Sequence, residues 1–279
     1  MIPQKNISTI SNLTSKDGGK KIPETVIERD YCLSWFLFGI SSSKIKDLLI
    51  FKGGTALRRC HFVDYRFSED LDFTLSKEIS LDDILKEFKN IYSWVQDESG
   101  IIFQFAKKEE SSHNTHTLYL SYVGPLPGSA KEVKVDITFK ETIVTPIEEM
   151  GIIKTYNEYY DFLADSKIMV YSLEEIAIEK ICALFAHDRK QPRDLFDIYN
   201  LIEEKNVKVA DLVNLVEMKL NFKNIRFESI KSNFEKKEAV FEKMWAPILG
   251  QQMSFLPPFQ EVFRKVKKSF RQAGLLDKD

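Results

Sequence analysis

Two short segments of the chain alternate between apolar and polar residues, as a β-strand with one buried face does. The first is DLDFTL (residues 70–75), and the second is VKVDITF (residues 133–139). Because side chains alternate between the two faces of a strand, the polar positions of each segment share one face. We therefore predict that Asp70 and Asp72 lie on the same side of one strand, about 6.6 Å apart along it. Asp136 lies on the polar side of the other strand.

Other segments repeat apolar residues every three or four positions, which is the spacing of an amphipathic helix. Residues 81–99 form the clearest example, with Ser80 and Asp83 as a capping-box-like start and Gly100 near the end. Pro23 opens an earlier helix, and residues 207–279 are helical by pattern apart from interruptions at prolines. Residues 1–21 are polar and read as an irregular arm.

These elements predict an α+β protein of two domains. We expect residues 1–150 to form a small mixed β-sheet backed by helices, with residues 1–21 as the arm. Residues 151–279 are expected to form a mainly helical domain that closes the active cleft. The junction is placed in the aromatic and polar stretch around residues 150–165, which has no long period.

A glycine turn stands between a short apolar strand and the first alternating segment. Residues 48–51 (LLIF) lead into Lys52 and then Gly53, Gly54 and Thr55, with helix-forming residues after them. We predict that Thr55 is the N-cap of that helix. A helix N-terminus preceded by glycines offers free backbone N–H groups to a phosphate. The stretch is not a Walker loop, because no Gly-Lys-Ser/Thr follows at the required spacing.

The glycine turn and the aspartate pair together indicate phosphoryl or nucleotidyl transfer. Each motif alone has an ordinary reading: Gly-Gly is usually a turn, and Asp-x-Asp is usually a solvated strand face. Combined, they place a phosphate site beside two carboxylates that can share hard divalent cations. Ser68, just before the aspartates, is a second candidate for phosphate contact.

The sequence resembles the AbiEii toxins, a nucleotidyltransferase family related to the polymerase-β-like nucleotidyltransferases. The motifs that carry the resemblance are KGGTAL, RFSEDLDF, KVDITF, EEIAIEKICAL and PRDLFDIYNL, between about Glu28 and Leu201. The resemblance implies transfer of a nucleoside monophosphate from an NTP to an acceptor hydroxyl, with two Mg²⁺ ions that Mn²⁺ can replace. This sequence departs from minimal nucleotidyltransferases in two ways: the gap between the glycines and the aspartates is longer, and Thr55 stands where many of them have serine.

The resemblance also implies roles for individual residues. It assigns three residues to the metals and to catalysis: Asp70, Asp72 and Asp136. Gly53, Gly54, Thr55 and Ser68 are expected to bind the nucleotide phosphates. Lys180 is implied to neutralise the triphosphate, and Asp194 to support it.

Lys180 has a plainer alternative, because it lies on an apolar helix stripe and could extend its ammonium group to water. If Lys180 instead serves the triphosphate, we expect its replacement by alanine to cost little stability, because the change removes a desolvated charge from an apolar stripe. Asp194 could likewise be no more than a favourable charge in the first turn of its helix.

Composition narrows the possible partners. The 279 residues are 43% hydrophobic and 29% charged, and the formal net charge is −2, so no overall positive field attracts nucleic acid. The chain has three cysteines and no apolar leader or membrane-length stretch, which predicts a soluble cytoplasmic protein with no membrane partner. One local basic run stands out near the C-terminus, in residues Arg264, Lys265, Lys267, Lys268 and Arg271. Such a run is usually a solvated face, but its density also suits an RNA backbone.

The resemblance implies a toxin of a bacterial toxin–antitoxin pair that modifies tRNA or another RNA, with NTP as substrate and a cognate antitoxin as partner. Two alternatives stay open. One is nucleotidylation of a protein or a small molecule. The other is a catalytically inert module of the same fold that binds RNA or a partner protein.

Overall fold

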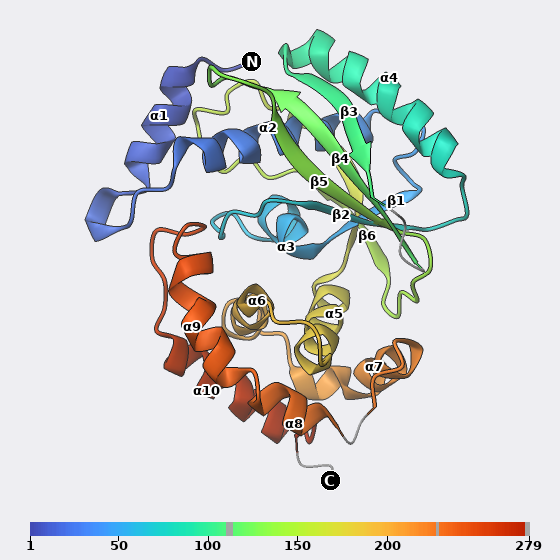
Figure 1. Cartoon of the computed structure of the whole chain (residues 1–279), viewed down its shortest axis with the longest axis vertical. Coiled ribbons are helices and arrows are strands. Elements are labelled where there is room, and N and C mark those ends of the chain that lie inside the picture. Colours follow the sequence, from blue (N-terminus) through green and yellow to red (C-terminus); the bar gives the residue numbers. More distant parts are fainter. Residues whose placement is uncertain (110–113, 227–228, 277–279) are drawn as a thin grey trace. The chain divides into compact units, whose positions relative to one another are not determined.

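The computed structural model describes residues 1–109, 114–226 and 229–276 (Figure 1). Its internal contacts divide the chain into two compact units. The first unit comprises Met1–Glu141 and Ile147–Tyr171, and the second comprises Thr142–Pro146 and Ser172–Asp279. Each unit is described by itself below.

A seven-stranded mixed sheet, in the order β3-β4-β5-β2-β1-β7-β6, forms the first unit. The strands are β1 (Leu49–Lys52), β2 (Leu71–Leu75), β3 (Ile102–Lys108), β4 (Thr115–Val123), β5 (Lys131–Thr138), β6 (Ile147–Gly151) and β7 (Lys167–Tyr171). β2 pairs in parallel with β5 and β1 with β7, while the other neighbours are antiparallel. The predicted α+β class and mixed sheet are confirmed.

The predicted alternation holds in both central strands. Leu71 and Phe73 of β2 and Val135 and Ile137 of β5 are fully buried, whereas Asp72 is only half-buried. Helices α2 (Glu24–Ser41) and α4 (Leu81–Ser99) pack against the sheet, and the Phe36 ring of α2 lies 5.3 Å from the Phe103 ring of β3. One face of these strands is therefore core, and the other face carries the aspartates.

The N-terminal segment is more regular than its polar composition predicts. Residues Gln4–Leu13 form helix α1, where an irregular arm was expected. Ile7 and Ile10 are completely buried, and the Ser11 hydroxyl donates a 2.6 Å hydrogen bond to the Ile22 carbonyl. Tertiary burial of a few apolar residues thus overrides a weak local propensity. In the same way β6 and β7, which have no clear period, form by pairing with each other and with β1.

Helices make up the second unit: α5 (Leu173–Phe185), α6 (Pro192–Glu203), α7 (Val209–Phe222), α8 (Ile230–Glu235), α9 (Glu238–Leu249) and α10 (Phe259–Gln272). The Phe234 ring stacks on Phe263 at 5.1 Å and lies 5.3 Å from Phe270. This aromatic cluster joins α8 to α10 in the core of the unit. Ser172 caps α5 by accepting a 3.1 Å hydrogen bond from the Glu175 amide.

Candidate nucleotidyl-transfer site

A polar row crosses the middle of the sheet. In the observed register Lys52 of β1 is opposite Asp72 of β2, Asp72 is beside Asp136 of β5, and Asp136 is opposite Thr117 of β4. Residues that are opposite each other on neighbouring strands point to the same face. The two aspartates predicted on separate strands therefore lie side by side, one strand spacing apart, on the face that is not core. Asp70 lies directly before β2.

Asp136 is held by two neighbours on this face. Its Oδ1 accepts a 2.7 Å hydrogen bond from the Thr117 hydroxyl, and its Oδ2 accepts a 2.6 Å hydrogen bond from the Lys134 ammonium group. Burial lowers the pKa of Lys134, but the hydrogen bond and charge of Asp136, with the charges of Asp70 and Asp72, raise it overall. All three carboxylates thus act on one ammonium group.

The glycine turn lies directly against these carboxylates. Gly53 has φ +80°, and a Cβ on it would stand 2.5 Å from the Asp72 carboxylate oxygen Oδ2. A Cβ on Gly54 would meet the Arg66 guanidinium at 2.4 Å and the Ser68 hydroxyl at 3.3 Å. At Gly53 both the positive φ and the close approach to the Asp72 carboxylate favour glycine. The structure thus places Gly53 against Asp72, and Gly54 against Arg66 and Ser68.

Thr55 has a different position from the predicted one. The helix α3 (Gly53–Ala56) begins at Gly53 with Lys52 as its N-cap residue, and it continues into a π-helical segment, Leu57–His61. Thr55 is buried inside this helix, so the N-cap prediction is wrong. Its hydroxyl instead donates a 2.5 Å hydrogen bond to the Asp70 carbonyl. Thr55 thereby fixes the backbone of Asp70 relative to the glycine turn.

A buried ion cluster anchors the π-helical segment. Arg58 Nε donates a 2.6 Å hydrogen bond to Asp30 Oδ1, and Arg59 forms an ion pair with the other oxygen of the same carboxylate. All three side chains are at most 2% exposed. Burial raises the pKa of Asp30, but the charges and hydrogen bonds of Arg58 and Arg59 lower it below its ordinary value. This cluster ties the glycine helix to α2.

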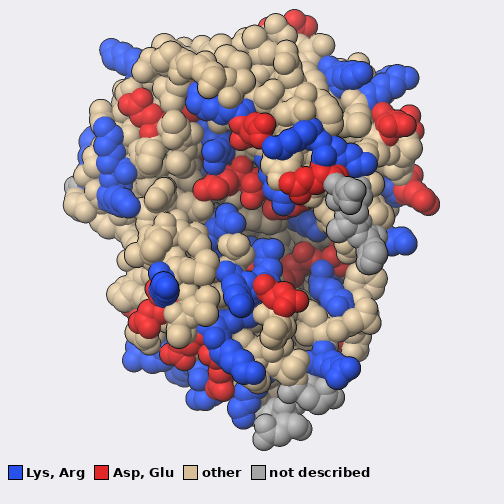
Figure 2. All heavy atoms as spheres, in the orientation of Figure 1, with Lys and Arg blue, Asp and Glu red and all other residues tan. Residues whose placement is uncertain are grey.

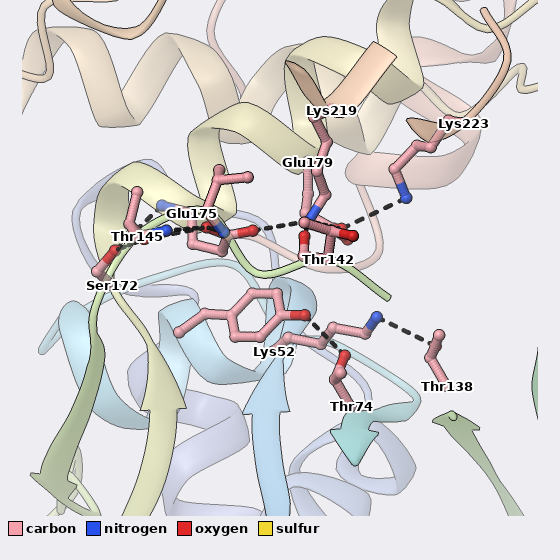
Figure 3. A network of polar contacts seen from close by, with 12 residues as sticks. Lys52, Thr74, Thr138, Thr142, Thr145, Ser172, Glu175, Glu179, Lys219 and Lys223 are labelled. Atoms are coloured by element: carbon pink, nitrogen blue, oxygen red, sulfur yellow. Dashed lines mark hydrogen bonds and ion pairs between the residues drawn. The ribbon is translucent and has the colours of Figure 1, made fainter. Parts of the chain in front are cut away.

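Three basic residues near the carboxylates were missed by the sequence analysis: Lys52, Arg66 and Lys134. Lys52 is 9% exposed, and its ammonium group donates a 3.1 Å hydrogen bond to the Thr138 hydroxyl (Figure 3). Arg66 is 3% exposed. Each of these residues lies inside a motif that the sequence analysis used: KGG, RFSED or KVD. The signal that could have identified them was a basic residue at a position expected to be buried or to lie on the same strand face as the aspartates.

Lys180 and Asp194 meet within the second unit, in a buried cluster. The Lys180 ammonium group lies 2.7 Å from Asp194 Oδ1 and 2.7 Å from Asp197 Oδ2, and Arg189 Nε lies 2.8 Å from Asp194 Oδ2. Burial raises the pKa of Asp194, but Lys180 and Arg189 lower it overall. The alternative in which Lys180 extends to water is therefore wrong, since its side chain is 11% exposed and paired.

A second buried cluster holds the segment 142–146 within the same unit (Figure 3). The Lys219 ammonium group lies 2.7 Å from Glu175 Oε1 and also donates to the Thr142 carbonyl. Glu175 Oε2 accepts hydrogen bonds of 2.9 Å from the amides of Val144 and Thr145. These contacts satisfy buried polar groups. They also engage both side-chain oxygens of Glu175, and no hydrogen bond among the described residues joins the Glu175 side chain to the Ser172 amide.

The AbiEii family model, described as a nucleotidyl transferase toxin of a type IV toxin–antitoxin system, matches residues 35–271. The chain belongs to the AbiEii family. The match covers most of the chain, including the glycine turn, all three aspartates of the sheet, and Lys180 and Asp194. This AbiEii protein is accordingly a nucleotidyltransferase, as the resemblance implied. Comparison with curated protein sequences gives no significant match.

Solved structures agree with this fold. JHP933 from Helicobacter pylori is 18% identical with a TM-score of 0.60, over 92% of this chain and 95% of that one. MenT4, a nucleotidyltransferase toxin from Mycobacterium tuberculosis, is 15% identical with a TM-score of 0.61, over 100% of this chain and 91% of that one. A putative nucleotidyltransferase from H. pylori is also similar, at 18% identity and a TM-score of 0.58 over 92% of this chain and 98% of that one.

Divalent metal suits the donor chemistry of this AbiEii site. Asp72 and Asp136 present hard carboxylate oxygens at adjacent register positions, beside a glycine cradle that any Cβ would fill. In the part of the chain that the structure describes, no three Asp, Glu, His or Cys side chains converge closely enough to hold a metal ion. In this structure the positive charge that faces the Asp136 carboxylate is the Lys134 ammonium group.

Across the described residues, no helix has the length and apolar character needed to span a membrane.

Proposed function

We propose that this AbiEii protein transfers a nucleoside monophosphate from an NTP to a hydroxyl group of an RNA, with tRNA as the acceptor class that the family resemblance implies. The observation that carries the proposal is the register of β2 and β5, which sets Asp72 beside Asp136, with the glycine turn against Asp72. The backbone N–H groups of a glycine turn beside carboxylates suit a metal-bound triphosphate.

Asp70, Asp72 and Asp136 would hold two Mg²⁺ ions, or Mn²⁺ in their place. When bound, these ions supply charge stabilisation for the α-phosphate and the leaving pyrophosphate. The acceptor oxygen forms the new bond to the α-phosphorus as the bond to the pyrophosphate oxygen breaks. Asp136 is suited to accept the hydroxyl proton, because its carboxylate is half-exposed and on the open face of the sheet.

The basic residues beside the glycine turn suit the phosphates of the NTP. Gly53 and Gly54 provide backbone groups, Ser68 a hydroxyl and Arg66 a guanidinium. Thr55 serves as a positioning residue through its hydrogen bond to the Asp70 carbonyl. For Lys180 and Asp194, the roles that the resemblance implies stay predictions, and we propose no contact between them and the nucleotide.

The basic C-terminal helix α10 is our proposed contact for the RNA backbone. Lys265 is paired with Glu203 and Glu261, and Lys267 with Glu235. Three exposed basic residues line a groove of about 890 Å³ along the helix: Arg264, Lys268 and Arg271. Figure 2 shows blue and red side chains intermixed on the visible face of the second unit. At spacings of three and four residues, these three share a helix face and suit successive phosphates.

One further partner follows from family membership. We infer a cognate antitoxin, since the family is that of type IV toxin–antitoxin toxins. The alternative acceptors, a protein or a small molecule, would use the same carboxylates with a different hydroxyl. An inert binding module is the least supported, because the aspartates and the glycine cradle are all in place.

The test is to incubate the protein with each of the four α-³²P-labelled NTPs, Mg²⁺ and total RNA, and to resolve the products by size. We expect label in one RNA size class with the wild type and none with Asp136→Asn. Label on protein or on a small molecule would replace RNA as the acceptor. The absence of label on any acceptor with all four NTPs would contradict nucleotidyl transfer.

A further inference from the structure

Lys134 holds an unusual place for a lysine beside a metal-binding carboxylate. It lies on β5 two residues before Asp136, so both side chains project from the same face of the strand. Its ammonium group lies 2.6 Å from Asp136 Oδ2, and the side chain is 35% exposed. It is therefore neither locked in the core nor free in solvent, and it can leave its partner without unfolding the strand.

The charges around Lys134 are mostly negative. Asp136 contacts it directly, and Asp70 and Asp72 act on it electrostatically. Lys52, the basic residue opposite Asp72 in the row, directs its ammonium group to Thr138. A cation beside a carboxylate stabilises its charged form. Lys134 is placed to supply that cation from within the chain.

We propose that Lys134 is a tethered cation that occupies Asp136 in the metal-free protein, and that a divalent ion must displace it in order to bind. Lys134 would thus set the metal affinity of the site, as a positioning residue rather than a catalytic one. The inference rests on the proposed function only in assigning the divalent ion to Asp70, Asp72 and Asp136.

Two effects then oppose metal binding in the wild type. The ion must break a charge-assisted hydrogen bond, and it must enter a site where a unit positive charge already lies within contact distance of one ligand. Replacing Lys134 with a neutral side chain removes both effects. The same replacement removes the lysine partner of Asp136, so the metal-free protein should lose stability.

The experiment is a titration of the purified protein with Mn²⁺, followed by electron paramagnetic resonance of the free ion, without nucleotide. Lys134→Met and Lys134→Gln should bind Mn²⁺ about tenfold or more tightly than the wild type. Lys134→Arg, which keeps the charge, should remain within about threefold of the wild type. Asp72→Asn identifies the site, because it should abolish this binding. Lys107→Met is the matched control, since Lys107 is a strand lysine 3.4 Å from Glu132 on an exposed surface.

Thermal unfolding gives a second measurement on the same proteins. In EDTA, Lys134→Met should melt at a lower temperature than Lys107→Met, and added Mn²⁺ should raise its melting temperature by more than it raises that of the wild type. Both results support the tethered cation.

Three outcomes separate the possibilities. Equal or weaker Mn²⁺ binding by Lys134→Met and Lys134→Gln overturns the inference and leaves the proposed function standing. Binding that Asp72→Asn does not change contradicts both the inference and the metal assignment of the proposed function. Binding seen only in the neutral variants supports the inference in its strongest form, with the ammonium group excluding the ion.

Discussion

The carboxylates of the sheet and the carboxylates of α6 meet their basic partners in two different environments. Asp136 and Lys134 are 22% and 35% exposed, whereas Asp194 and Asp197 are at most 1% exposed. In the first case water or a ligand can take the place of either partner. In the second case the carboxylates are shielded from water, and removing their shared lysine would leave buried negative charge poorly compensated.

The same difference extends to the other ion clusters. The carboxylates of Asp30 and Glu175 are buried and satisfied by arginines, a lysine or backbone amides. Exposure therefore distinguishes clusters that hold the fold from the carboxylates that can exchange ligands. Sequence motifs alone do not make this distinction, because Asp70, Asp194 and Asp30 are all aspartates near basic residues.

The largest expected effect is the loss of nucleotidyl transfer when a half-exposed carboxylate of the site, Asp70 or Asp136, is neutralised. Asp70→Asn and Asp136→Asn should each reduce nucleotidyl transfer by about a thousandfold or more, because each change removes charge that stabilises the transition state through the metal. Initial rates of α-label transfer measure the effect. Asp97→Asn, an exposed residue near the end of α4, is the control and should transfer at the wild-type rate. Activity retained in either site variant would contradict the assignment.

Removing a buried partner should instead cost stability. Asp30→Ala leaves Arg58 and Arg59 buried without a counter-charge, which should lower the free energy of unfolding by about 3–5 kcal/mol. Urea denaturation measures the change. The control is Glu69→Gln, which removes an exposed pair with Arg29 at 3.8 Å and should cost less than about 1 kcal/mol. Because the folded-state pKa of Asp30 is lowered, its contribution is present at neutral pH and is lost as the pH falls below that pKa.

Lys180→Ala should have a similar cost in the second unit, about 3–5 kcal/mol, because it leaves Asp194 and Asp197 without their shared lysine. This reverses the expectation from the sequence, in which a lysine on an apolar stripe could be removed at little cost. Lys190→Ala, at an exposed position, serves as the control. A melting temperature equal to that of the wild type would show that the cluster does not hold the unit together.

The predicted strands illustrate what the sequence can reveal. The alternation in β2 and β5 correctly gave the faces of Asp72 and Asp136, since a period of two leaves no other arrangement. The sequence could not predict that these two strands are neighbours or which residues are paired, because the partners Asp72 and Asp136 are far apart along the chain. The same holds for the partners of Lys180 and for the buried hydroxyl of Thr55, which depend on packing between separate elements.

A smaller effect is expected at the glycine turn, where two glycines provide a matched pair. Gly53 and Gly18 have φ of +80° and +83°, but a Cβ on Gly18 would meet nothing within 4 Å. Alanine at either position should cost about 1–2 kcal/mol of stability through the backbone. Only Gly53→Ala should also slow transfer, by about a hundredfold, because its Cβ displaces the Asp72 carboxylate. Equal transfer by the two variants would remove the glycine turn from the site.

The smallest effect concerns the basic groove on α10. Replacing the exposed pair Arg264 and Lys268 with glutamine should reduce the slope of log affinity for RNA against log salt by about 1.4, from about 0.7 per phosphate contact. Replacing Lys265 and Lys267, which are paired with glutamates, should leave the slope nearly unchanged. Filter binding across a salt series measures both. Identical slopes in the two double variants would show that α10 is a solvated face.

The most direct test of the central claim measures transfer and stability together on Asp72→Asn. Asp72 is half-buried and lies between Lys52 and Asp136 in the register, with the glycine turn against its carboxylate. The account predicts that transfer of the α-phosphate label is lost while the melting temperature in EDTA stays near that of the wild type, because asparagine keeps the size of the side chain and removes only its charge. Retained transfer, or a melting temperature several degrees lower, would contradict it.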